Sequence, residues 1–352
     1  LQNGSAAFKS WKTKSSPSKF AVYLYNLTNP DQVLAGERPN LTVIGPYVYW
    51  KEVRKLNISW TSVDGTPAIS YLKRSIYIFD PILSSGNPKL DKIISANLPI
   101  LNVFPRNLPN RPRRTSIKLF SLQSNNTMKG PYVIDSGINN STNTGSFITI
   151  KGSRSLNIWS TEKANAIHGT DGFRLARNIQ LSDSREIFVT LLCQPITLNA
   201  TKISRPKAFT ELEVVEMELD TDSRTLKETY CPLKVSGPPC PPKGYYDISQ
   251  CSVPGDVSPP VFASLPRFMD KPIDNAFIVR EVDQTRDKFR LLAEPVVKTG
   301  IVVEAHVRLL VNVHIQRSPH MTDLFMNISD PMYLPMAWFE NVRSFSHSFY
   351  YY

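Results

Sequence analysis

The sequence lacks any apolar run long enough to cross a membrane: no window approaches the ~18 consecutive apolar residues that a transmembrane helix needs. The first residues, Leu1 to Ser5, contain neither the basic stretch nor the apolar core of a signal peptide. We therefore expect the targeting and membrane-anchoring segments of the protein to lie outside residues 1–352.

Catalytic motifs are missing as well. There is no G-x-S-x-G elbow, H-E-x-x-H helix, phosphate loop or dinucleotide fingerprint. The segment 167–172 (IHGTDG) holds His, Thr and Asp together, but a catalytic triad needs no such adjacency, and Gly-Thr-Asp-Gly is typical of a tight turn. The sequence thus predicts neither an enzyme nor a cofactor.

Histidine is scarce and predicts no metal site. The five histidines are residues 168, 306, 314, 320 and 347. His306 and His314 fall on the polar face of one predicted strand, where eight residues separate them too widely to bind one metal ion without other strands. We interpret both as surface histidines.

Cysteine is also scarce, and its spacing favours disulfide bonds over zinc. The four cysteines are Cys193, Cys231, Cys240 and Cys251. There is no C-x-x-C pair, and gaps of eight and ten residues separate the last three, which fits no common zinc spacing. Two disulfide bonds formed in an oxidising compartment account for all four.

Glycosylation signals are frequent and point to the same compartment. Nine N-x-S/T sequons begin at Asn3, Asn26, Asn40, Asn57, Asn125, Asn139, Asn140, Asn199 and Asn327. Because N-linked glycans are added in the secretory pathway, these sequons predict a lumenal or extracellular glycoprotein.

The net charge of +11 calls for an anionic partner, but no nucleic-acid motif accompanies it, and the sequons oppose a nuclear or cytosolic location. Anionic lipids or acidic proteins are more natural partners. The densest basic run comprises Arg106, Arg111, Arg113, Arg114 and Lys118. It is either a ligand or membrane contact or a solvated loop, and the sequence does not decide between them.

Residues 301–316 carry the clearest strand signal, because apolar side chains alternate with mostly polar ones over the whole stretch. The apolar face can fill a closed core or line a lipid-holding cavity. Residues 20–27 and 187–198 also read as strands, with turns predicted at Gly45-Pro46 and at residues 64–67. Residues 87–98 predict a short amphipathic helix, with Pro88 at its first position.

Residues 23–49 (YLYNLTNPDQVLAGERPNLTVIGPYVY) closely resemble the start of class B scavenger receptor ectodomains. Further segments follow in family order: residues 7–11 (AFKSW), 151–159 (KGSRSLNIW), 167–172 (IHGTDG), 245–251 (YYDISQC), 263–268 (ASLPRF), 294–300 (EPVVKTG) and 335–339 (PMAWF). The resemblance covers nearly the whole chain. Residues 87–103 are most similar to the lysosomal integral membrane protein branch.

The resemblance implies a mainly β fold with helical elements (α+β), in which a large antiparallel β-barrel core holds a lipid tunnel beneath an apical helical cap. Residues 1–352 would form a single lumenal or extracellular ectodomain, with flanking transmembrane helices and short cytoplasmic tails absent from this chain. It also implies the pairings Cys193–Cys251 and Cys231–Cys240. A further bridge of some relatives maps to Ala164 and Thr229, so both of its partners are missing together.

Two departures from the family pattern stand out. His168 occupies the position of the Asn in the family's N-G-T-D. The stretch between Asn102 and Phe120 is much shorter than in relatives, where it supplies most of the apical bundle. Either this member lacks that bundle, or a segment is missing from the sequence here, which is the interpretation we favour. The cap is expected to be incomplete.

The implied function is that of a membrane-anchored scavenger and lipid receptor active in endocytosis. Such a receptor conducts cholesterol, fatty acids or phospholipids toward the bilayer and meets anionic lipid or protein ligands at its apex. Its expected location is the lysosomal or endosomal membrane, facing the lumen, and also the plasma membrane, facing outward. The alternative is a lysosomal sorting receptor for a lumenal hydrolase. A secreted hydrolase is disfavoured by the missing motifs.

Overall fold

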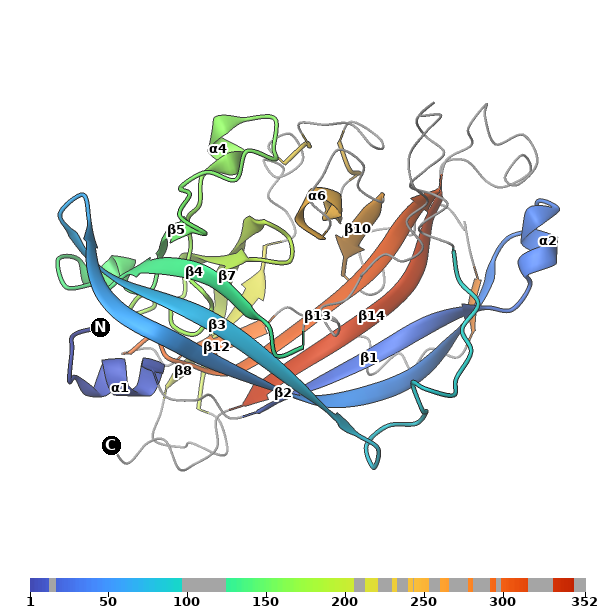
Figure 1. Cartoon of the computed structure of the whole chain (residues 1–352), viewed down its shortest axis with the longest axis horizontal. Coiled ribbons are helices and arrows are strands. Elements are labelled where there is room, and N and C mark those ends of the chain that lie inside the picture. Colours follow the sequence, from blue (N-terminus) through green and yellow to red (C-terminus); the bar gives the residue numbers. More distant parts are fainter. Residues whose placement is uncertain are drawn as a thin grey trace.

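A single large β-sheet dominates the computed structural model (Figure 1). The structure describes residues 1–12, 17–96, 125–205, 213–220, 230–232, 240–242, 244–252, 260–265, 278–280, 292–295, 299–315 and 332–344. Within these ranges the helices are short, and none is long and apolar enough to cross a bilayer. The prediction of a mainly β chain with minor helical elements is confirmed.

The sheet has 14 strands, paired antiparallel except where β11 joins β2. The strands are β1 (Ser18–Leu27), β2 (Asn40–Val63), β3 (Thr66–Asp80), β4 (Met128–Asp135), β5 (Phe147–Ile150), β6 (Ser184–Val189), β7 (Gln194–Ser204), β8 (Val214–Leu219), β9 (Tyr245–Asp247), β10 (Val261–Ser264), β11 (Ile278–Arg280), β12 (Leu292–Pro295), β13 (Val302–Ile315) and β14 (Met332–Ser344). The helices are α1 (Ala6–Lys12), α2 (Pro30–Leu34), α4 (Glu162–Asn165) and α6 (Ser249–Ser252), with a 3-10 turn at Ser141–Asn143.

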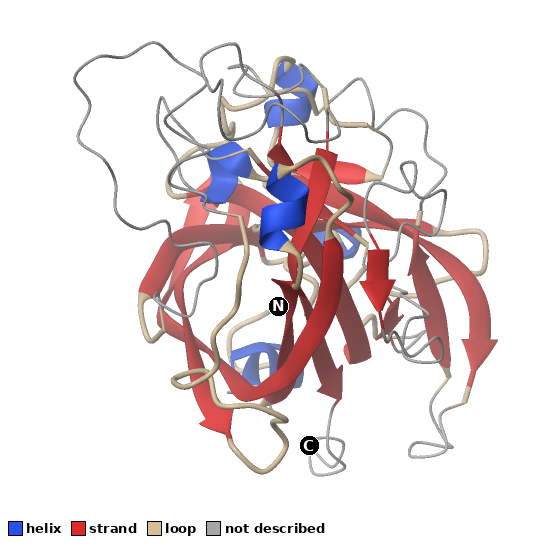
Figure 2. Cartoon of the chain, turned by 90° about the vertical axis from the view of Figure 1, so that its right-hand side faces the viewer, coloured by secondary structure: helices blue, strands red, loops and turns tan. Residues whose placement is uncertain are grey.

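The main path of the sheet runs β5-β4-β3-β2-β1-β14-β13-β12-β8-β7-β6, so the first and last described strands are neighbours at its centre. Continuous pairing among the described strands leaves this path open, and the predicted closure into a barrel is not made by strand pairing. The sheet is nevertheless strongly curved (Figures 1 and 2).

A loop joins the two ends of this path. Thr170 makes isolated bridges to Ser146, next to β5, and to Ile187 in β6. The carbonyl of Gly169 accepts a hydrogen bond from the amide of Phe147 at 2.9 Å. The φ of Gly169 is +85°, and a Cβ added to it would lie 3.1 Å from the amide nitrogen of Phe188 in β6. A glycine is required there for both reasons. The predicted tight turn is therefore a link between the two ends of the sheet.

The strand predicted at residues 301–316 is confirmed as β13, which pairs with β14 along its whole length. The polar face of β13 is only partly exposed to solvent, however. Toward the end of β13 both faces are covered, and His314 is 4% exposed beside the ring of Tyr333, 4.8 Å away between centroids. The prediction of a surface histidine at position 314 is wrong, because Phe262 of β10 and Tyr333 of β14 cover it.

Two other predictions fail where distant strands override the local pattern. Gly45-Pro46 lies inside β2 instead of in a turn, opposite a register shift between Val22 and Leu24 of β1. The shift is a β-bulge, which absorbs the irregular backbone of Gly45, whose φ is +125°. The strand predicted at 187–198 is a hairpin, in which a turn at 190–193 separates β6 from β7.

The helix predicted at residues 87–98 is also absent from its described part, residues 87–96. A single turn at 88–90 is followed by extended chain, and Leu90 is 74% exposed. The amide of Ile94 donates to the side chain of Asn26, and its carbonyl accepts from the amide of Leu27. These bonds to β1 replace the hydrogen bonds that a helix would have made.

Disulfide bonds join Cys193 to Cys251 and Cys231 to Cys240, the pairings implied by the resemblance. The first anchors α6 to the β6–β7 turn. Beside α6 lies an aromatic group, here called the tyrosine cluster, formed by Tyr245, Phe262, His314 and Tyr333.

Candidate functional site

Five basic side chains converge on the inner face of the sheet. This cationic cluster consists of Lys51 and Lys55 of β2, Lys73 of β3, Lys129 of β4 and Arg343 of β14. Pairing explains their proximity, because Lys55 lies opposite Lys73, and Lys73 lies opposite Lys129. Residues four apart on a strand point to the same face at a spacing of about 13 Å, which places Lys51 on the face of Lys55, with Val53 between them.

Aromatic rings line the same surface. The Nζ of Lys55 lies 4.6 Å from the ring centroid of Trp11 in α1 and 4.2 Å from that of Phe173, which Arg343 also contacts at 4.2 Å. Lys51 stands over Phe20 and Tyr77 at 5.8 and 5.6 Å.

Lys73 stands over Tyr132 of β4, with its Nζ 5.3 Å from the ring centroid. Cation–π contacts at these distances favour a protonated amine without neutralising its charge. The lining of the cluster is therefore aromatic and positively charged at once.

Negative charge is scarce around the cluster. Asp171 is the acidic group that raises the pKa of Lys55, Lys73 and Arg343, and its Oδ2 accepts a hydrogen bond from Tyr71 at 3.3 Å. In the described part of the chain no carboxylate forms an ion pair with Lys51 or Lys73. Lys51 and Lys73 are thus positive charges that no carboxylate of the described residues pairs with.

Burial is the main cause of the pKa shifts in the cluster. Burial and, to a smaller extent, nearby Arg343 lower the pKa of Lys51 to about 8. Burial likewise lowers the pKa of Lys55 and of Lys73 to about 8, while Asp171 partly opposes the shift. Burial holds the pKa of Arg343 at about 10, so it stays charged at neutral pH. Half-buried like charges with shifted pKa values are characteristic of binding sites.

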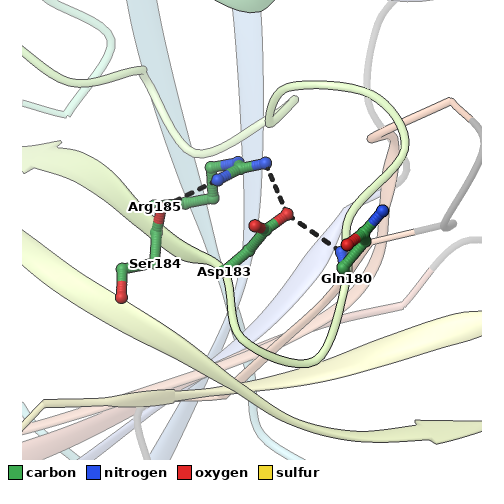
Figure 3. Close-up of polar contacts among 4 residues, drawn as sticks. All are labelled: Gln180, Asp183, Ser184 and Arg185. Atoms are coloured by element: carbon green, nitrogen blue, oxygen red, sulfur yellow. Dashed lines mark hydrogen bonds and ion pairs between the residues drawn. The ribbon is translucent and has the colours of Figure 1, made fainter.

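Arg185 and Arg308, in contrast, are each paired with an acid. Figure 3 shows Asp183, whose Oδ2 accepts from Arg185 at 2.8 Å and from the amide of Gln180 at 2.9 Å. On the other face of β13, Arg308 donates to Glu340 at 2.6 Å. These pairs show that the fold supplies counter-charges to other cations.

The neighbouring inner surface is apolar and incompletely covered. Leu24, Ile44, Tyr49, Tyr77 and Phe79 border the core of β1, β2 and β3 but remain half-buried. Tyr77 packs on Phe20 at 5.3 Å, which connects this apolar lane to Lys51. An acyl chain could lie along the lane while its charged end meets the cationic cluster.

Some of the predicted site residues lie outside the described part of the structure. These are the basic segment Arg106, Arg111, Arg113, Arg114 and Lys118, and the sequon at Asn327. The other sequon asparagines are exposed or half-exposed: Asn3, Asn57, Asn125, Asn139 and Asn140 are exposed, and Asn26, Asn40 and Asn199 are half-buried. Their glycosylation remains a prediction.

The histidines provide no metal site within the described residues, where no group of three or more His, Cys, Asp or Glu side chains is placed to hold an ion. His168 instead contacts Glu186 at 2.7 Å, and His306 contacts Glu304 at 2.7 Å.

Sequence reasoning missed the cationic cluster. The available signal was the alternation Tyr49, Lys51, Val53, Lys55 in β2, where basic residues replace apolar ones on a face that begins with aromatic residues. Asp171 and Phe173 were missed because the sequence around residues 167–172 predicts only a tight turn.

Comparisons with known protein sequences show which family this chain resembles. A sequence model described as the CD36 family matches residues 1–117 and 104–350. Human lysosome membrane protein 2 is 24% identical over 363 residues, covering 90% of this chain and 73% of that protein. Scavenger receptor class B member 1 of Cricetulus griseus is 24% identical over 394 residues, with coverages of 97% and 73%. Sensory neuron membrane protein 1 of Apis mellifera is 20% identical over 404 residues, with coverages of 97% and 75%.

These alignments also bear on the short stretch near Asn102–Phe120. Each is longer than the chain's 352 residues, so the relatives carry residues with no counterpart here. The two family matches overlap at 104–117, which puts the interruption of the family pattern in that stretch. Because the family model covers nearly the whole sequence, this chain belongs to the CD36 family of scavenger receptors and lysosomal membrane proteins.

Proposed function

We propose that this chain is the ectodomain of a membrane-anchored receptor that takes up lipids on the inner face of its sheet and conducts them toward the bilayer. The observation that carries the proposal is the half-buried apolar lane of Leu24, Ile44, Tyr49, Tyr77 and Phe79, which leads to the cationic cluster. Apolar surface of this kind can shelter an acyl chain or a sterol from water without any bond chemistry.

The location of the lane supports conduction toward a membrane. Under the proposal, the flanking transmembrane helices adjoin the two ends of the chain, near α1 and the end of β14. Trp11 of α1 contacts Lys55 of the cationic cluster, and Arg343 of β14 is itself a member of the cluster. The lane would therefore end on the membrane side. The membrane is lysosomal or endosomal, or the plasma membrane, by analogy with lysosome membrane protein 2 and scavenger receptor class B member 1.

Native mass spectrometry combined with lipid extraction of the purified glycosylated chain tests the proposal. We expect fatty acids, phospholipids or sterols to co-purify, and Phe79→Ala to reduce their amount. An Ala substitution at outward-facing Ile78, which is 57% exposed, serves as the control and should not change it. Failure to recover lipid under any mild condition would count decisively against the conduit.

The alternative function, sorting of a lumenal hydrolase, depends on the apical segment around residues 102–120. That segment lies outside the described residues, and no described contact favours this alternative.

A further inference from the structure

We propose that the cationic cluster is a binding site for a single anionic group, a carboxylate or a phosphate, which it takes from the head of an amphiphile. This inference rests on the proposed lipid function and specifies its ligand chemistry. A conduit for neutral sterols alone would need only the apolar lane, whereas the five basic residues add a feature that only a charged ligand uses.

Strand pairing places several donors on one stretch of the inner face. Lys51 and Lys73 approach from neighbouring strands and form no ion pair with a described carboxylate, so their ammonium protons can turn toward a ligand. Lys55 donates one hydrogen bond, to the carbonyl of Trp11 at 2.8 Å, and an ammonium has three protons to give. Charge-assisted hydrogen bonds from several ammonium groups are a strong way to hold an oxyanion.

The uncompensated charge of the lysines also favours an anionic ligand. Bringing like charges together in a half-buried setting costs stability unless a counter-charge arrives. Among the described residues, Asp171 is the acidic group that acts on Lys55 and Lys73, and it also accepts a hydrogen bond from Tyr71. The neighbouring phenols supply no further negative charge, because burial raises the pKa of Tyr71, Tyr77 and Tyr132. An anionic ligand would complete the charge balance.

The rings around the lysines suit a headgroup that arrives with a chain. Tyr77 lies below Lys51 and belongs to the apolar lane, so a carboxylate at the lysines leaves its chain on Tyr77, Tyr49 and Phe79. A free inorganic anion would use the lysines and leave the lane uncovered. The two sources of the anion are therefore separable by experiment.

The test measures dissociation constants of the delipidated chain for three probes: oleate, oleyl alcohol and inorganic phosphate. Oleate and oleyl alcohol share their chain and differ in charge. We expect oleate to bind at least about tenfold more tightly than oleyl alcohol, as for one charged hydrogen bond. In the double variant Lys51→Met, Lys73→Met this preference should disappear through loss of oleate affinity, while binding of oleyl alcohol is unchanged. The control Lys19→Met, an exposed lysine facing outward on β1, should preserve the preference.

The binding results separate the anion site from the lipid conduit. Equal binding of oleate and oleyl alcohol, or an oleate preference that survives in the double variant, overturns the anion site and leaves the lipid conduit standing. Binding of phosphate alone, lost in the double variant, supports the anion site with a free anion as its source and contradicts the conduit. Failure of all three probes overturns both. Thermal unfolding of each variant confirms that it is folded.

Discussion

The tyrosine cluster and the cationic cluster both contain polar groups packed against the sheet, but they differ in the partners of those groups. Around the tyrosine cluster, the side chain of Asn312 donates to Ser264 at 3.0 Å, and Asp247 accepts from the amide of Ser249 at 2.8 Å. In the cationic cluster, Lys51 and Lys73 face other cations and rings.

Exposure differs as well. Phe262 and His314 are buried, whereas the three lysines keep part of their surface open. Polar groups therefore serve two purposes in this fold. Partnered and sealed groups fix the packing, while concentrated like charges left partly open have a ligand as their natural complement.

The largest effect is expected from Phe262→Ala, which should destabilise the protein by about 3–5 kcal/mol, because Phe262 is 1% exposed and holds the tyrosine cluster together. Chemical denaturation measures it. The oleate preference should persist at temperatures where the variant is folded. A loss of that preference in the folded variant would show that the two clusters are not independent.

A gain in stability is expected from Lys51→Met or Lys73→Met, on the order of 1 kcal/mol for each lysine after solvent screening. In the folded protein the lysine pKa is about 8, below the ordinary value of 10.5. The free-energy cost of burying the charged lysines is therefore at its full value below pH 8, and it disappears as the pH rises toward 10.5. Melting temperatures at pH 7 and pH 10 check this. If the methionine variants were less stable than the original chain at pH 7, the lysines would have a structural role.

The affinity for oleate should depend on pH, whereas the affinity for oleyl alcohol should not. Oleate should bind best below about pH 8 and lose affinity as the pH rises, because Lys51, Lys55 and Lys73 lose their protons there. Oleyl alcohol has no charge and should show no such decline. Calorimetry from pH 6.5 to 9.5 makes the comparison. Parallel curves for the two ligands would refute a role for the lysine charges.

The smallest effect is expected from Asp171→Asn. Removing the acid that opposes the cations should raise oleate affinity by about threefold and leave oleyl alcohol unaffected. The amide retains an oxygen that can accept from Tyr71, so the loop should keep its place. Reduced oleate affinity would show that Asp171 positions the site.

Much of the fold could be predicted from local patterns. The alternation in residues 301–316 predicts β13, and Asp64-Gly65 predicts the turn between β2 and β3. The resemblance implies both disulfide pairings. What failed depends on contacts between distant segments: the chain after Pro88 pairs with β1 instead of forming a helix, and His314 is buried by strands far away in sequence.

The cationic cluster was hidden for the same reason. Its members come from four strands, and only the registers of β2 with β3 and of β3 with β4 bring Lys55, Lys73 and Lys129 together. Asp171 joins them because its loop links the two ends of the sheet. A sequence shows which residues share a face of one strand, but it does not show which strands are neighbours.

The most direct test of the anion site is a crystal structure of the chain grown with a fatty acid brominated along its chain. The site predicts anomalous bromine peaks beside Tyr49, Tyr77 and Phe79, and a carboxylate within ~4 Å of the Nζ atoms of Lys51 and Lys73. A fatty acid bound on the outer face, or one on the inner face with its carboxylate turned away from the lysines, would contradict it.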